Sequence, residues 1–251
     1  MLKESNPMNL SRNSFLITLT TMSLVALTVT TGHAQLPNPA TLTGLNPGDT
    51  YQFIFVTSGT TAATTAGATF YNTFVQTAAN NVGIGNTLSM TWKAMVATGI
   101  QSSPVRADAN APVAATTKVY LINGTQIANG GTNAFYSNTN HLAAINITEL
   151  GGTLNTQVWT GSNASGSESG SGLVGNAANQ NPVWGLSGGT TASNSSGSSW
   201  SREGNATWTQ TKSLYGISNA LIYTVSSAPE PGTLALLALG GTLVLARRRR
   251  K

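Results

Sequence analysis

The chain has 251 residues, of which 40% are hydrophobic and only 8% charged, so it is long enough for one domain with a substantial core. Its 27 glycines and its many serines, threonines and asparagines make the polar fraction largely uncharged, which excludes a charge-driven disordered chain and a coiled coil. It contains no cysteine, which excludes disulfides, thiolate metal sites and a cysteine nucleophile.

The formal net charge of +5 comes entirely from the two ends of the chain. Between residues 35 and 228 the charges cancel, because five bases face five acids: Lys93, Arg106, Lys118, Arg202 and Lys212 against Asp49, Asp108, Glu149, Glu168 and Glu203. A protein that binds nucleic acid gathers several cations on one face. We therefore expect no nucleic-acid partner.

Residues 1–34 have the three zones of a secretory signal peptide. Lys3 and Arg12 supply positive charge, residues 15–29 are mainly apolar, and Gly32-His33-Ala34 places small residues where a signal peptidase reads them. We predict cleavage between Ala34 and Gln35, with an uncleaved anchor helix as the alternative. Met8 is as suitable as Met1 for the initiating methionine.

The C-terminal segment 228–251 has three parts in a fixed order. Pro229-Glu230-Pro231 cannot join a helix, because its prolines lack amide hydrogens and fix φ, so it should stay extended and accessible. The uncharged residues 232–246 follow as a predicted transmembrane helix, and Arg247, Arg248, Arg249, Arg250 and Lys251 end the chain. At about 1.5 Å per residue, residues 233–246 reach roughly 21 Å, so they need snorkelling arginines to span a bilayer. The cations should stay in the cytoplasm.

This segment, paired with an N-terminal signal, resembles the PEP-CTERM sorting signal of Gram-negative bacteria. The resemblance implies that an exosortase, a membrane-embedded cysteine transpeptidase, cuts the chain near Pro229-Glu230-Pro231. It also implies a transient inner-membrane anchor, followed by delivery to the cell surface or to an extracellular matrix rich in exopolysaccharide. The alternative is an ordinary tail anchor that contains Pro-Glu-Pro by chance.

The remaining residues, 35–227, form the predicted exported domain. Short runs of β-branched and aromatic residues predict strands over 51–57, 90–96, 157–160 and 220–225. Residues 118–128 predict a hairpin, because Asn123-Gly124 suits a type I′ turn. The Gly/Ser/Asn/Thr-rich stretches 161–172 and 187–199 predict long loops.

One helix is predicted over residues 69–80, between Gly67 and Gly83. Phe70, Phe74 and Ala78 fall at i, i+4 and i+8, which predicts that this aromatic stripe faces the core. The fold class is therefore α+β in a single strand-rich domain.

The body also weakly resembles bacterial exported domains of unknown function that are similar to the C-type-lectin-like and endostatin-like fold. The resemblance lies in the order of short motifs: Tyr51 to Ser58, Phe70 to Phe74, Thr91 to Ala94, Arg106 to Asp108, Val119 to Ala128, Val158 to Gly161, Gly185 to Ser187 and Trp200. It implies a lectin-like fold. Neither Glu-Pro-Asn nor Gln-Pro-Asp occurs, so it brings no calcium site to this chain.

No catalytic constellation stands out. His141 is the one histidine left after signal cleavage, and we interpret it as a surface or loop residue. No serine occupies the centre of a Gly-x-Ser-x-Gly elbow. The carboxylates show no local pairing of the glycosidase type, and Arg106–Asp108 and Arg202–Glu203 are predicted as charge pairs. We expect no enzyme activity, no cofactor and no metal site.

Two functions remain open for the domain: a structural component of the surface, matrix or biofilm, or a lectin-like module that binds carbohydrate or protein. The second would use aromatic stacking without calcium. Its candidate residues are Trp159, Trp184, Trp200 and Trp208. Each of them also suits a core position.

Overall fold

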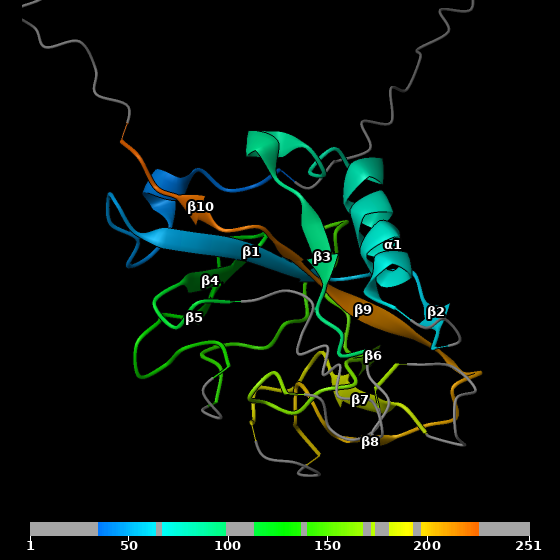
Figure 1. Cartoon of the computed structure of the whole chain (residues 1–251). Helices are drawn as coiled ribbons and strands as arrows, with labels where there is room; N and C mark the ends of the chain where they lie inside the picture. The colour runs from blue at the N-terminus through cyan, green and yellow to red at the C-terminus, as the bar shows by residue number, and fades with distance from the viewer. Residues whose placement is uncertain are drawn as a thin grey trace, which may run out of the picture. The chain divides into compact units, whose positions relative to one another are not determined.

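The computed structural model describes residues 35–63, 67–98, 113–136, 140–167, 172–173, 181–192 and 197–225. Within them, ten strands form one sheet with a single α-helix beside it, so the predicted strand-rich fold is confirmed (Figure 1). Two short 3-10 helices are η1 (Pro39–Thr41) and η2 (Thr87–Ser89). The strands are β1 (Thr50–Val56), β2 (Thr61–Ala62), β3 (Trp92–Ala94), β4 (Lys118–Leu121), β5 (Gln126–Ala128), β6 (Gln157–Trp159), β7 (Val183–Leu186), β8 (Gly204–Asn205), β9 (Thr211–Ser218) and β10 (Leu221–Ile222).

Strand β1 forms where the sequence predicts it. It lies between β4, to which it is parallel, and β9, to which it is antiparallel. Phe53, Ile54, Phe55 and Val56 are all fully buried, so both faces of the strand are covered. This explains its continuous apolar run, since a strand buried on one face alone would alternate with polar residues.

Strand β9 (Thr211–Ser218) is the centre of the sheet, although the sequence pattern did not predict it. It pairs with β1, β2 and β3 in the antiparallel sense and with β6 in the parallel sense. The order along the sheet is β5-β4-β1-β9-β6-β7-β8. The strands β7 and β8, also unpredicted, extend the sheet from β6.

The β4–β5 hairpin is confirmed, but its predicted type I′ turn is wrong. A type I′ turn needs positive φ at both central residues. Here only Gly124 has positive φ (91°), and its amide donates to the Leu121 carbonyl oxygen at 2.8 Å. The turn is therefore centred on Ile122 and Asn123, with Gly124 in the left-handed region after them, and the register of the ladder shifts between Val119 and Tyr120.

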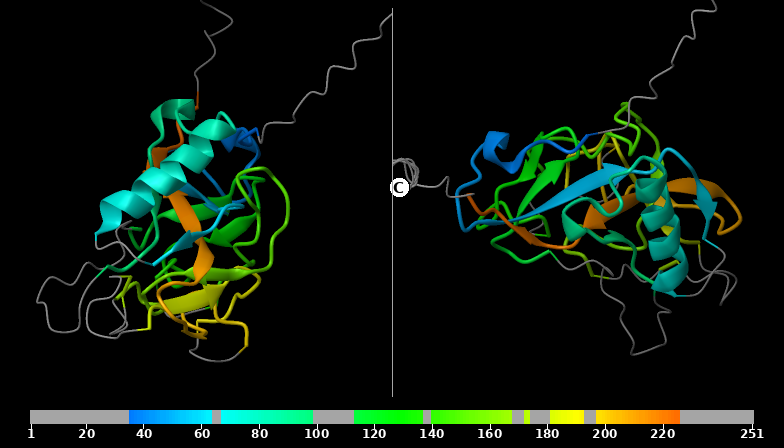
Figure 2. Two further views of the ribbon diagram at one scale, coloured as in Figure 1. Left: turned by 90° about the vertical axis from the view of Figure 1, so that its right-hand side faces the viewer. Right: turned by 90° about the horizontal axis from the view of Figure 1, so that it is seen from above.

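Helix α1 (Ala68–Asn81) confirms the predicted helix, and its C-cap Val82 is followed by Gly83 with φ 80°. It lies across β3 and β9, as the two views of Figure 2 also show. Two of its amides cover the free edge of β3: Asn72 Oδ1 accepts from Ala94 N at 2.9 Å, and Gln76 Oε1 from Trp92 N at 2.8 Å. The helix thus replaces a missing neighbouring strand.

The helix buries a different face from the one predicted. Its buried residues are Tyr71, Val75 and Ala79, whereas Phe70 is 42% exposed and Phe74 is only partly buried. The reason lies in β9, where Gly216 has no side chain and Val75 fills the space. A Cβ at Gly216 would lie 2.4 Å from Val75 Cγ1. The predicted aromatic stripe is therefore turned away from the sheet.

Candidate functional site

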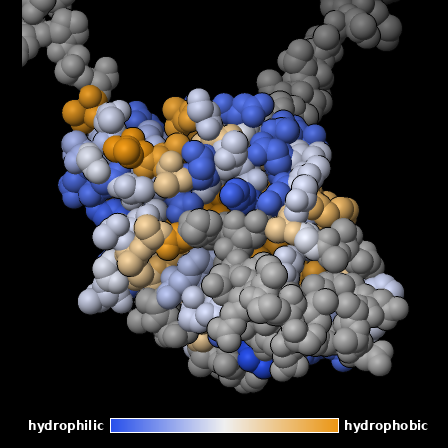
Figure 3. All heavy atoms as spheres, in the orientation of Figure 1, coloured by the Kyte–Doolittle hydropathy of each residue, from blue (hydrophilic) through white to orange (hydrophobic). Residues whose placement is uncertain are grey.

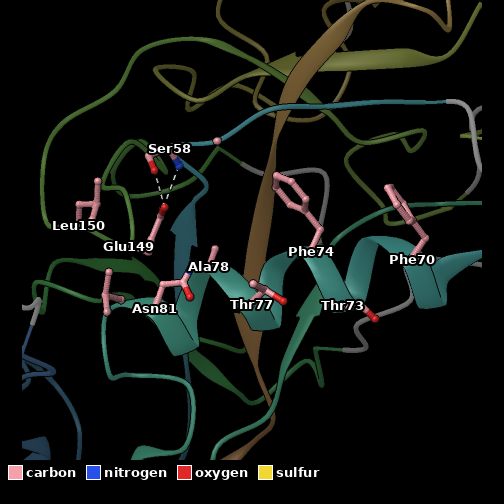
Figure 4. Close-up of a pocket in the computed structure, with 11 residues that line it drawn as sticks. Ser58, Phe70, Thr73, Phe74, Thr77, Ala78, Asn81, Glu149 and Leu150 are labelled. Atoms are coloured by element: carbon pink, nitrogen blue, oxygen red, sulfur yellow. Dashed lines mark hydrogen bonds between the residues drawn. The ribbon is translucent and has the colours of Figure 1, made fainter.

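The outward side of α1 forms one wall of a groove with a volume of about 540 Å³ (Figure 4). Such a volume suits a small-molecule site. The groove is lined by Ser58, Gly59, Phe70, Thr73, Phe74, Thr77, Ala78, Asn81, Val82, Glu149 and Leu150.

Two rows of helix residues run along this wall. The apolar row is Phe70, Phe74, Ala78 and Val82, at intervals of four residues, and its two rings point into the groove in Figure 4. The polar row, Thr73, Thr77 and Asn81, has the same spacing. The stripe of Phe70, Phe74 and Ala78 that was predicted to face the core is therefore part of an amphipathic surface beside the buried face of the helix.

The opposite wall is the turn that carries Glu149 and Leu150. Gly151, with φ 82°, donates its amide to the Thr148 carbonyl oxygen at 2.8 Å, which closes the turn. Val56 N in turn donates to the Ile147 carbonyl oxygen at 2.9 Å. The end of β1 therefore positions Glu149 against α1.

Glu149 is only 5% exposed, and Ser58 holds both oxygens of its carboxylate. Ser58 N donates to Oε2 at 2.8 Å, and Ser58 Oγ donates to Oε1. In the described part of the chain the one salt bridge is Lys118–Asp49, so Glu149 has no cationic partner there. Local sequence could not predict this pair, because Ser58 and Glu149 are 91 residues apart in the chain.

The four tryptophans predicted for ligand stacking differ in burial. Trp159 and Trp200 are fully buried, so the prediction that they stack on a ligand is wrong: their rings complete the core. Trp184 and Trp208 are partly buried against that core. None of the four lines the groove at α1.

His141 lies in a loop, but the expectation that it is a surface residue is wrong. It is 5% exposed, and its ring stacks on Trp200 and Phe135, with centroid separations of 4.5 Å to each. Nε2 lies 3.2 Å from the Phe135 carbonyl oxygen, which only accepts, so this nitrogen carries the proton. Burial lowers the pKa of His141 to about 4, against a smaller opposing effect of that hydrogen bond.

The remaining carboxylates have separate structural roles. Asp49 pairs with Lys118, whose hydrogen bond lowers the pKa of the carboxyl group. The predicted Arg202–Glu203 pair is wrong, because Glu203 instead accepts the amides of Gly197 and Ser199, at 2.7 and 3.0 Å. Asp108 and Glu168 lie outside the described residues, as does Arg106.

Both predicted processing regions also lie outside the described residues, apart from the exposed Gln35. For the C-terminal region, comparison with protein families is decisive. Residues 227–251 match the model of the PEP-CTERM protein-sorting motif. This PEP-CTERM match includes Pro229-Glu230-Pro231, the predicted helix 232–246 and the basic tail. It makes the chain an exported protein with a C-terminal sorting signal for an exosortase. No curated protein matches the chain in sequence.

Among the described residues, no helix has the length and hydropathy to cross a bilayer. The predicted segment 232–246 lies outside them. On the face shown in Figure 3, hydrophobic side chains of the described part occur in small groups among polar ones. Among the residues that the structure describes, the exposed large hydrophobic side chains are Phe70, Leu88, Leu142, Leu150, Ile222 and Val225.

Proposed function

We propose that the domain is a non-enzymatic component of the cell surface or of the extracellular matrix and biofilm of a Gram-negative bacterium. A signal peptidase removes residues 1–34, helix 232–246 holds the chain briefly in the inner membrane, and an exosortase cuts near Pro229-Glu230-Pro231. The PEP-CTERM match at residues 227–251 is the observation that carries this proposal.

The way the domain ends supports release by cleavage after residue 225. Tyr223 N donates to the Asp49 carbonyl oxygen at 2.9 Å, and Gly48 N donates to the Tyr223 carbonyl oxygen at 2.8 Å. Strand β10 also pairs with Thr50 and Tyr51 of β1. Because these bonds precede the sorting segment, its removal costs the domain none of them.

The test is processing in native cells, with an epitope tag upstream of residue 225. The parent chain should mature to a form that lacks Lys251, and Glu230→Ala should keep Lys251 and stay in the membrane fraction. Thr242→Ala, within the predicted helix, is the matched control and should mature normally. Mature parent protein that still carries Lys251 in its mass spectrum would contradict the proposal.

A second candidate is a lectin-like module that binds carbohydrate at the cell surface, and the two tryptophans that are only partly buried favour it. A lectin-like use of the domain would draw on Trp184 and Trp208, whose rings are partly buried. Binding of the organism's own exopolysaccharide that Trp184→Ala or Trp208→Ala abolishes, with the fold intact by circular dichroism, would support it. Binding that survives both substitutions would contradict it.

A further inference from the structure

Three of the polar side chains that line the groove at α1, those of Ser58, Thr73 and Glu149, have fixed hydrogen-bonding roles. The Ser58 hydroxyl already donates to Glu149, and the Thr73 hydroxyl already donates to the Thr69 carbonyl oxygen at 3.0 Å. Glu149 as a carboxylate only accepts. These three side chains therefore offer a ligand acceptors and no donors.

Charge points to the same kind of ligand. Glu149 carries a buried negative charge at the groove, with two hydrogen bonds from Ser58 and, among the described residues, no cation. A buried charge is costly unless it is paired. A ligand cation would complete its environment, because each carboxylate oxygen has a further lone pair for a second donor.

The apolar row defines the rest of the ligand. The rings of Phe70 and Phe74 project from α1 into the groove, on the side where Ser58 and Glu149 meet (Figure 4). Aromatic rings attract cations over their faces and bury apolar surface. Leu150, which is exposed, adds apolar surface on the opposite wall.

We propose that the groove binds a small organic cation, an ammonium group attached to an apolar body. The ammonium group donates to Glu149 and to the Ser58 hydroxyl oxygen, and the apolar body lies against Phe70 and Phe74. An ammonium has three donors and no acceptor, which matches the acceptors that Glu149 and Ser58 present at the groove. A neutral sugar brings no positive charge to Glu149.

The test uses the full chain purified in a non-ionic detergent and titrated by calorimetry with three probes. These are 3-phenylpropylammonium, its neutral analogue 3-phenylpropan-1-ol, and a neutral oligosaccharide. Only the ammonium should bind saturably. Tighter binding of the alcohol or the oligosaccharide, or no saturable binding of the ammonium, would overturn the proposal.

Four variants locate the site. Glu149→Gln keeps the size of the side chain and can still exchange hydrogen bonds with Ser58, yet it should weaken ammonium binding at least tenfold. Phe70→Ala, at an exposed position, should weaken it about threefold. Ala78→Leu should block the groove, and Thr69→Ala, exposed on α1 but outside the groove lining, should change nothing.

Circular dichroism of each variant separates loss of the site from loss of the fold. Undiminished ammonium binding by folded Glu149→Gln would contradict the proposal. If Glu149→Gln does not fold, undiminished ammonium binding by folded Phe70→Ala and Ala78→Leu would contradict it instead. The experiment does not depend on the sorting proposal, which is tested by processing in cells.

Discussion

The ammonium of Lys212 lies 4.9 Å from the ring centroid of Trp159 and 5.5 Å from that of Trp184. It is a buried cation with no carboxylate partner among the described residues: Nζ donates to Gln157 Oε1, and to Gln210 Oε1 at 3.0 Å. Burial lowers the pKa of Lys212. The faces of two indole rings and two amide oxygens thus stabilise the Lys212 cation in place of a carboxylate.

We predict that Lys212→Met destabilises the domain by about 1 kcal/mol, because the cation–π contacts are lost and two amide oxygens lose their donor. Urea unfolding followed by tryptophan fluorescence measures the change. Lys93→Met is the matched control, since Lys93 is exposed on β3, and it should be nearly neutral. Equal effects of the two substitutions would show that the indole contacts add no stability.

The stability of the domain should fall between pH 6.5 and pH 4 because of His141. Its pKa is about 4 in the folded chain against an ordinary 6.5, so protons bind the unfolded chain first as the pH falls. The free energy of unfolding should drop by about 3 kcal/mol across this range and level off below it.

Urea unfolding at a series of pH values tests this. In His141→Phe the ring still stacks between Phe135 and Trp200 but does not titrate, so most of the slope should vanish. The lowered pKa of Asp49 acts in a separate range, below its ordinary value of 3.8. An unchanged slope in His141→Phe would assign the pH dependence to other groups.

Gly216→Ala should destabilise the domain by about 2 kcal/mol, through overpacking where α1 crosses β9. The added Cβ would lie 2.4 Å from Val75 Cγ1 and 2.7 Å from Phe55 Cζ. Gly152→Ala is the control, because its Cβ would approach nothing closer than Thr148 Oγ1 at 3.7 Å. Thermal unfolding of both should differ by several degrees, and coincident curves would refute this account of the helix packing.

Gln76→Leu should destabilise the domain by about 1 to 2 kcal/mol, because it removes the acceptor of Trp92 N from the edge of β3. The Gly85 carbonyl oxygen would also lose its donor, Gln76 Nε2, at 3.1 Å. Hydrogen exchange should accelerate at the Trp92 amide. With Thr69→Ala as control on the same helix, unchanged exchange in Gln76→Leu would mean that the amide does not protect this edge.

The elements that were predictable have local signals. Strand β1 and the β4–β5 hairpin are runs of β-branched and aromatic residues, and α1 lies between two glycines. Strand β9 lacks such a signal, because Gly216 interrupts it and Lys212, Ser213 and Ser218 are polar. They are nevertheless buried, and Ser218 Oγ accepts from Phe53 N, a residue 165 positions away.

The groove was not predictable for a similar reason. Helix α1 has two adjacent apolar rows, and nothing local distinguishes the row with Phe74 from the row with Val75. The choice depends on Gly216, and the approach of Glu149 to Ser58 depends on the end of β1. By contrast, the sorting segment is a continuous linear motif that works through its order of residues, so the sequence alone sufficed to recognise it.

The position of β9 in the chain bears on when the domain can fold. Strand β9 (Thr211–Ser218) pairs with strands that begin as early as residue 50. The sheet therefore lacks its central strand until residues 211–218 have been exported. A chain threaded across a membrane from its N-terminus must therefore stay open for almost its whole passage. The sheet can therefore close only after the residues just before the sorting segment have crossed the membrane.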